Sequence, residues 1–288
     1  MNSQLDSSSL QIHTTNQNRV HRKMKTLVEF ASPEDLRKIR GSSPWASNQQ
    51  GSYTDSLLRP EYASRKLQFQ IGKTWIRIVP SIKTTSFDWM MGVQALAYKG
   101  GRHAHPKTLG AGKSAFDQAY TWFSANKPDL LFSKTNRDGY RLLSDPVSVF
   151  WALVEESGRP VSRIFVGSAY DGSRGGAQGL GCQIYRLVKD LADEPNPLAD
   201  PVDPENGVMI CIEKMQPAGA KFASYSLRLG SNPSPMSGHI NRMAEEELAV
   251  LCPIENTIQI LSEDEEYRRL AKIGIDSDTL SAIRSSVR

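Results

Sequence analysis

The stretch DPVSVFWALVEESGRPVSRIFVGSAY, residues 145–170, decides the fold that the sequence predicts. Apolar and β-branched residues fill both halves, and Ser157-Gly158 separates them. Val, Ile and aromatic residues favour extended strands, and a two-residue segment ending in glycine suits the left-handed conformation of a tight turn. The stretch therefore predicts a long β-hairpin.

Further strands are expected on either side of this hairpin. KLQFQIGKTWIRIVPSI, residues 66–82, predicts two short strands about a turn at Gly72. WMMGVQALAY, residues 89–98, predicts a third strand. VMICIEK and KFASYSLRLG, residues 208–214 and 221–230, predict a last strand pair.

Helices are expected near residues 114–125 and 181–193 and in the region after residue 237. They do not alternate regularly with the strands, which argues against a parallel α/β layer. We therefore expect a mainly β fold: an OB-fold core, a five-stranded barrel, with inserted loops and helices and a helical C-terminal region. A β-sandwich is the alternative architecture.

Composition divides the chain into three expected parts. Residues 1–58 are rich in Ser, Asn, Gln and Thr and predict a flexible arm with one short helix. Residues 59–237 hold the predicted strands and are the expected OB-fold core. Residues 238–288 are an expected helical region for partner binding or oligomerisation.

Charge is distributed unevenly along the chain. Residues 59–174 contain 17 Lys and Arg against 9 Asp and Glu, a balance of +8. Residues 1–58 balance to +2 (7 minus 5) and residues 175–288 to −6 (11 minus 17). A basic middle predicts a surface for a polyanion. The three cysteines form no CxxC pair, and neither a signal-peptide pattern nor an apolar run of membrane-span length is present, so we expect a cytoplasmic protein.

HPKTLGAGKSAF, residues 105–116, ends like a phosphate-binding loop. The G-x-x-x-x-G-K-[ST] pattern needs a glycine five residues before Gly112, but that residue is Lys107. The residues before the loop are polar and basic, so no apolar strand leads into it. We interpret the segment as a flexible basic loop that enters a helix, and we do not expect an NTPase.

The common catalytic signatures G-x-S-x-G and H-E-x-x-H are absent from the sequence. His103 and His105 stand at i and i+2, but no cysteine or acidic partner lies near them in sequence, so we expect no metal site and no cofactor. The main expectation is a protein that is not an enzyme. A metal-dependent nuclease remains an alternative, with four candidate carboxylates: Asp145, Glu155, Glu156 and Asp171.

Aromatic and basic residues interleave along the predicted strands and loops, which is typical of single-stranded nucleic-acid sites. Bases stack on the rings, and the cations neutralise phosphates. Trp75 and Arg77 share one face of a predicted strand, and because an arginine seldom faces a closed core, that face is a candidate groove. The candidate stacking residues are Trp75, Tyr98, Tyr140 and Tyr170, and the candidate backbone contacts are Arg77, Lys99, Arg102, Lys107, Lys113, Arg137, Arg141, Arg163 and Arg174.

Five stretches resemble the single-stranded-DNA-binding proteins of tailed phages, the helix-destabilising replication proteins: KTWIRIVPS (73–81), SRIFVGSAYDGSRGGAQGLGCQIYRLV (162–188), DPENGVMICIEK (203–214), AKFASYSLRLG (220–230) and PMSG (235–238). The resemblance implies an OB-fold core and sequence-independent binding and protection of single-stranded DNA in phage DNA replication, recombination and repair. It also implies the cytoplasm of an infected bacterium, self-association on DNA, and polymerase, helicase or recombinase partners.

The chain departs from this family at three places. Members begin with a short Lys/Arg-Ser/Thr-rich motif that promotes cooperative binding, which HRKMKT, residues 21–26, resembles only loosely and later in the chain. Members carry a His/Cys zinc module after the early strands, whereas residues 99–125 contain His103 and His105 but no cysteine, so no zinc is expected. Members also end in an acidic tail that recruits partners. Here SEDEE, residues 262–266, is followed by YRRLAKIG and a basic end, so recruitment through such a tail is expected to differ.

A structural or assembly protein is a second alternative function. Three consecutive glutamates precede a short apolar group, Leu248, Val250 and Leu251, and this pattern favours a helix with one apolar face. On this hypothesis the helical C-terminal region forms an oligomer interface, and the basic middle of the chain does not carry the function.

Overall fold

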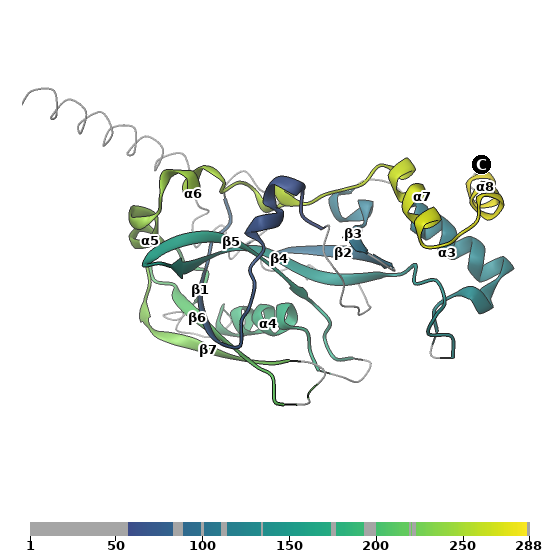
Figure 1. Cartoon of the computed structure of the whole chain (residues 1–288). Coiled ribbons are helices and arrows are strands. Elements are labelled where there is room, and N and C mark those ends of the chain that lie inside the picture. The colour runs from purple at the N-terminus through teal and green to yellow at the C-terminus, as the bar shows by residue number, and fades with distance from the viewer. Residues whose placement is uncertain are drawn as a thin grey trace, which may run out of the picture.

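A computed structural model describes residues 57–286 except 83–88, 99–100, 111–113, 134, 174–176, 193–199, 219 and 221–222. In this part of the chain, seven antiparallel strands form one sheet in the order β3-β2-β4-β1-β6-β7, with β5 paired to β4 outside that path (Figure 1). The expected mainly β architecture is confirmed. The sheet is open, because no pairing between the described strands closes it into a five-stranded barrel.

The predicted long hairpin is present as β4, Ser144–Glu156, and β5, Arg159–Ser168. Ser157 and Gly158 form its turn with positive φ angles of 52° and 78°, the left-handed conformation that a two-residue hairpin turn requires. The opposite edge of β4 pairs with two further strands, β2 and β1. β4 is therefore the centre of the sheet.

The hairpin predicted about Gly72 is wrong. A single strand, β1, spans Gly72–Ile78, and residues 66–71 do not pair with it. Leu67 instead donates its backbone N–H to the carbonyl oxygen of Ile164 in β5, at 2.8 Å. The segment before β1 therefore runs along the edge of a strand that is distant in sequence.

The predicted last strand pair is present as β6, Val208–Met215, and β7, Ser224–Pro233, and β6 pairs with β1. The described edges of β5 and β7 do not pair with each other. Phe69 lies between them, with its ring centroid 6.1 Å from those of Phe165 in β5 and Tyr225 in β7. Side-chain packing thus links two strands that backbone hydrogen bonds do not.

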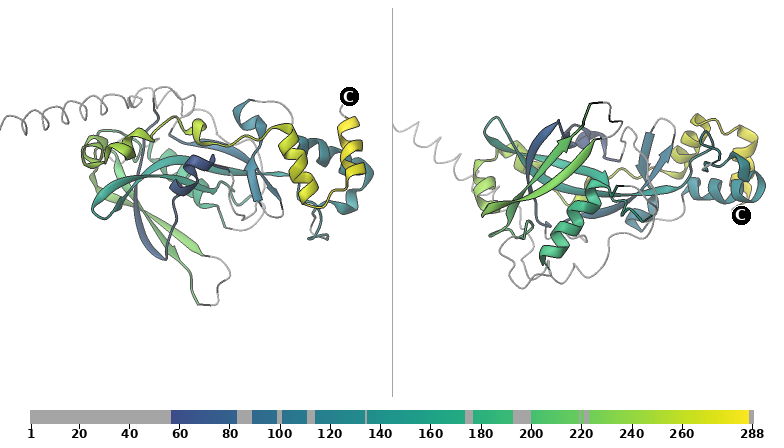
Figure 2. Two further views of the ribbon diagram at one scale, coloured as in Figure 1. Left: turned by 45° about the horizontal axis from the view of Figure 1, so that its top comes forward. Right: turned by 90° about the horizontal axis from the view of Figure 1, so that it is seen from below.

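Helix α4, Leu180–Ala192, follows β5 and covers the inner side of the curved sheet (Figures 1 and 2). Its residue Ile184 belongs to the same buried cluster as Ile76 of β1, Phe150 of β4 and Ile210 of β6. One core is therefore shared by the hairpin, the last strand pair and this helix.

The expected third strand is present as β2, Met91–Tyr98. The basic segment after it contains a further strand, β3, Gly101–Ala104, which pairs with β2 where a loop was expected. Helix α3, Ala115–Asn126, follows as predicted. The last two helices, α7, Glu263–Lys272, and α8, Ser277–Ser285, lie against α3 at one end of the molecule (Figure 2). We call α3, α7 and α8 the helical module.

The region after residue 237 packs into the same cores as the strands. Leu248 and Leu251 are buried in a cluster that contains Val149 of β4 and Ile164 of β5. These leucines, which suggested an oligomer interface, are thus used within the chain. The other short helices are η1 (Pro60–Arg65), η2 (Pro106–Leu109), η3 (Pro128–Leu130), α5 (Met236–Arg242), α6 (Glu245–Ala249) and η4 (Ile254–Thr257).

None of the helices in the described ranges combines the length and the apolar composition needed to cross a membrane.

Candidate nucleic-acid interface

Strands β1, β6 and β7 turn one face to the core and the other to the surface. Side chains alternate along a strand, so Ile76 points to the core while Lys73 and Trp75 point outward. The register aligns Trp75 with Cys211 of β6 and Arg228 of β7. We call the outward surface the Trp75 face, made of Lys73, Trp75, Glu213, Met215 and Arg228.

The ring of Trp75 is open to solvent. Trp75 is 44% exposed, and the Arg228 side chain two strands away is 66% exposed, with a loose contact of 3.5 Å to Glu213. Gly230 leaves room beside the ring, since a Cβ atom there would lie 3.6 Å from Trp75. An exposed indole with Lys73 and Arg228 on the same face can stack on a base while the cations neutralise phosphates.

Arg77, which was expected on this face, is fully buried. Its Nε donates to the carbonyl oxygen of Ser234 at 2.8 Å and its Nη1 to that of Ile78 at 3.0 Å. The guanidinium also donates to the carbonyl oxygens of Pro201 and Asp203. Burial lowers the pKa of Arg77 to about 10, so it stays charged at neutral pH. Arg77 is a structural residue and does not reach a ligand from this position.

Three other predicted contacts are also buried: Tyr98, Arg102 and Tyr170. Tyr98 packs against Phe116 of α3, and its hydroxyl accepts a hydrogen bond from Arg269 of α7. The helical module covers the end of β2, so this aromatic residue belongs to a core. These three assignments from the sequence are corrected, because coverage by distant segments could not be read from local pattern.

Arg137, Tyr140 and Arg141 lie on the connection between η3 and β4. Arg137 is exposed, whereas Tyr140 and Arg141 are half-buried. The Tyr140 hydroxyl donates to the carbonyl oxygen of Gly274 at 3.1 Å. The Arg141 guanidinium lies 5.4 Å from the ring centroid of Phe132. This group is at the end of the molecule that carries α3, away from the Trp75 face (Figure 1).

The remaining predicted cations are gathered neither on the Trp75 face nor around Tyr140 and Arg141. Lys107 lies 3.3 Å from Asp117, and Arg163 lies 2.6 Å from Glu156. These are surface ion pairs, which contribute little to stability and leave the cations near solvent. Three predicted residues lie outside the described ranges: Lys99, Lys113 and Arg174.

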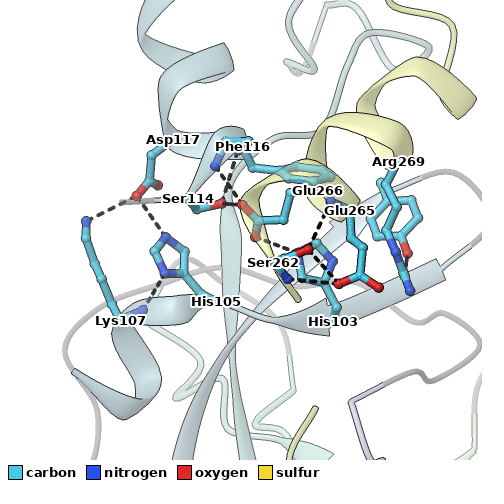
Figure 3. A network of polar contacts seen from close by, with 12 residues as sticks. His103, His105, Lys107, Ser114, Phe116, Asp117, Ser262, Glu265, Glu266 and Arg269 are labelled. Carbon is cyan, nitrogen blue, oxygen red and sulfur yellow. Dashed lines mark hydrogen bonds and ion pairs between the residues drawn. The ribbon is translucent and has the colours of Figure 1, made fainter. Parts of the chain in front are cut away.

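His103 and His105 bind two different helices of the helical module (Figure 3). His103 Nε2 lies 2.9 Å from Glu266 of α7, and His105 Nε2 lies 2.8 Å from Asp117 of α3. Burial lowers the pKa of His103, and the carboxylate of Glu266 beside it acts in the opposite direction. The two histidines therefore cross-link β3 and its following turn to the helices.

Glu266 is the central residue of this network. Its Oε2 accepts hydrogen bonds from the Ser114 hydroxyl at 2.8 Å and from the backbone N–H of Ala115, the first residue of α3, at 2.6 Å. A carboxylate at a helix N-terminus satisfies an otherwise unpaired N–H and interacts favourably with the helix dipole. α7 thus caps α3 from a distance of about 150 residues in sequence.

The carboxylates considered for nuclease chemistry do not converge. Asp145 pairs with Arg141 at 3.1 Å, and Glu155 pairs with Arg242 at 2.6 Å. Within the described residues, no three His, Cys, Asp or Glu side chains are arranged to hold a metal ion.

Several members of the candidate interfaces, among them Lys73, Arg228 and Phe132, were not among the residues that the sequence predicted. Arg228 alternates with Leu227 and Leu229 in β7, and this alternation could have marked it as outward-facing. Phe132 is 47% exposed on an irregular loop, where no periodicity indicates which side chains face solvent.

In the comparisons with known proteins, no family model, no curated protein and no solved structure matches this chain.

Proposed function

We propose that this protein binds single-stranded DNA without sequence preference through the Trp75 face. The observation that carries the proposal is the exposed Trp75 ring on the same sheet face as Lys73 and Arg228. A flat ring accepts any base, because every base has a π-face. Cations along the strand path neutralise phosphates and release counterions, which supplies affinity without reading sequence.

The order of the elements supports an OB-type core. β1 pairs with both β4 and β6, the β4–β5 hairpin precedes α4, and the β6–β7 hairpin follows it. Five such strands with one helix suit a partly open OB barrel, in which β2, β3 and α3 form an insertion between the first two strands. The phage resemblance extends the proposal to a role in DNA replication, recombination and repair, with self-association on DNA.

Replacement of Trp75 tests the proposal directly. In a fluorescence anisotropy titration with labelled oligothymidylate, Trp75→Ala should weaken binding by about 5- to 150-fold, the equivalent of ~1–3 kcal/mol for one lost stack. Trp75→Phe should restore most of the affinity because it keeps an aromatic face. Lys73→Ala and Arg228→Ala should each reduce the slope of log affinity against log salt by about 0.7.

The matched control is Leu109→Ala, which removes a similarly exposed apolar side chain, 40% exposed, from another surface. It should leave affinity unchanged. A duplex of the same length should bind more weakly than the single strand. Equal affinity for single strand and duplex, or an unchanged affinity in a folded Trp75→Ala protein, contradicts the proposal.

A further inference from the structure

Phe132 is exposed, and its backbone is paired with the chain at Tyr140. Its N–H donates to the carbonyl oxygen of Tyr140 at 3.0 Å, and the N–H of Tyr140 donates to that of Leu130 at 2.8 Å. The two sides of the loop approach so closely at Gly139 that a Cβ atom there would lie 2.5 Å from the backbone of Leu131. An aromatic ring that is 47% exposed beside this paired backbone presents a preorganised contact surface.

A fixed cation lies beside this ring. The guanidinium of Arg141 is 5.4 Å from the Phe132 ring centroid, within the range of a cation–π contact. The same guanidinium donates to both carboxylate oxygens of Asp145, at 3.1 and 3.2 Å. Asp145 is buried, so it holds Arg141 in position next to the ring.

The charge of the segment favours an anionic ligand. Residues 127–145 contain four cations and three carboxylates, one of them the Asp145 that pairs with Arg141, a balance of +1. A site for single-stranded nucleic acid combines aromatic rings with cations. Phe132, Arg137 and Arg141 match this description, and we call them the Phe132 platform.

We propose that the Phe132 platform is a second contact for the same DNA strand, separate from the Trp75 face. This inference rests on the proposed function. Figures 1 and 2 show β1 in the body of the sheet and α3 at one end of the molecule, beyond β2 and β3, and η3 follows directly after α3. A short oligonucleotide therefore occupies the Trp75 face alone, whereas a longer strand also reaches the Phe132 platform.

A length series separates the two contacts. The probes are a labelled oligothymidylate of about 8 nucleotides, within the ~4–16 that one OB fold covers, and one about five times as long. Phe132→Ala should leave the affinity for the short probe unchanged and weaken the long one by about fivefold or more. Arg137→Ala should reduce the salt slope by about 0.7 for the long probe only.

The controls remove matched side chains elsewhere. Leu109→Ala deletes an exposed apolar group, and Lys189→Ala deletes an exposed cation on α4. Both variants should bind each of the two probes with the affinity of the wild-type protein. Circular dichroism and unfolding curves confirm that the Phe132→Ala protein is folded.

Each outcome decides one of the two proposals. An unchanged long-probe affinity in Phe132→Ala overturns the second contact and leaves this surface to a protein partner. An equal loss for both probes also overturns it, because the two places would then act as one site. If wild-type protein binds the short probe and Trp75→Ala does not, the proposed function stands whatever Phe132→Ala does. If wild-type protein binds neither probe, both proposals fail.

Discussion

Trp75 and Arg77 are two residues apart on the same face of β1, yet one is exposed and the other fully buried. Strand periodicity correctly predicts that they point the same way. They differ in what packs over them. Residues 201–203 and Ser234 lie over Arg77 and accept its hydrogen bonds. A guanidinium with several donors can be buried at low cost when backbone carbonyls satisfy it.

Removal of the Arg77 donors should destabilise the fold. Arg77→Met keeps most of the side-chain length but leaves buried carbonyl oxygens without partners, so the free energy of unfolding should fall by at least about 2 kcal/mol. Arg228→Met, on the same sheet face but exposed, should stay within about 0.5 kcal/mol of wild type. Urea denaturation measures both. Equal stability of the two variants would show that the carbonyl contacts of Arg77 contribute nothing.

Acidification should weaken the folded protein through His103. Burial holds the pKa of His103 below its ordinary value of 6.5. Below about pH 6.5 the unfolded chain binds a proton that the folded protein resists, so the free energy of unfolding falls as the pH decreases. We expect the stability difference between wild type and His103→Gln to shrink between about pH 7 and about pH 5.

Ionisation of Asp145 has the opposite effect on the pH dependence of the free energy of unfolding. Burial raises its pKa from 3.8 to about 6, so the stability it contributes at low pH is lost as the pH rises through that range. Asp145 is present in both proteins, and the comparison of wild type with His103→Gln therefore removes its effect. An NMR titration in which the His103 imidazole has a pKa of 6.5 or higher is the contrary result.

At the scale of elements, the acidic run 262–266 is the start of a helix. Ser262 and Glu265 form a capping box at the N-terminus of α7, which suits glutamates near the positive end of the helix dipole. The next residue, Glu266, turns inward and caps α3. Capping and amphipathic spacing are local signals, but the choice of the glutamate that becomes buried depends on the packing of α7 on α3.

Replacing either of two neighbouring glutamates in α7 should therefore reduce the stability of the protein by very different amounts. Glu266→Ala leaves His103, Ser114 and the N–H of Ala115 without their acceptor in a buried place, and should cost about 3 kcal/mol or more. Glu265→Ala removes only the exposed half of a capping box and should cause a much smaller loss. Thermal and urea unfolding of both variants test this order. A larger loss for Glu265→Ala would refute the capping of α3 by α7.

At the scale of the whole molecule, the described part of the chain is a curved sheet with a helical module at one end (Figure 2). The C-terminal segment connects the two ends: α5 and α6 lie near the β4–β5 turn, and α7 and α8 lie on α3 (Figure 1). Bridges from Ile258 to Leu58 and from Ile260 to Ala104 hold this segment against the rest of the chain. The region is part of the folded unit.

Deletion of residues 262–288 should therefore destabilise the protein. It removes α7 and α8 and exposes Leu96, Phe116 and Phe123, which are buried with Tyr267 and Leu270 in one core. We expect a lower melting temperature and binding of a hydrophobic dye such as ANS. A tail used only for recruiting partners could be deleted without either effect. Unchanged melting and no dye binding would support such a tail.

Local patterns were sufficient for the elements whose stability depends on neighbours in sequence. The Ser157-Gly158 turn, the apolar runs of β4 and β5, and the helix near residues 114–125 were predicted from the chain, and the structure confirms them. The hairpin about Gly72 failed because β5, about 90 residues away, accepts the hydrogen bond of Leu67.

Only the tertiary structure decides which surfaces are buried. Burial is a property of the whole fold, so Arg77, Tyr98 and Tyr170 could not be distinguished from Trp75 by residue type and alternation alone. The same reason explains His103 and His105, whose carboxylate partners include one that is 163 residues away. Chain composition determines that this protein carries rings and cations; within the described residues, long-range packing determines that the rings of Trp75 and Phe132 are exposed.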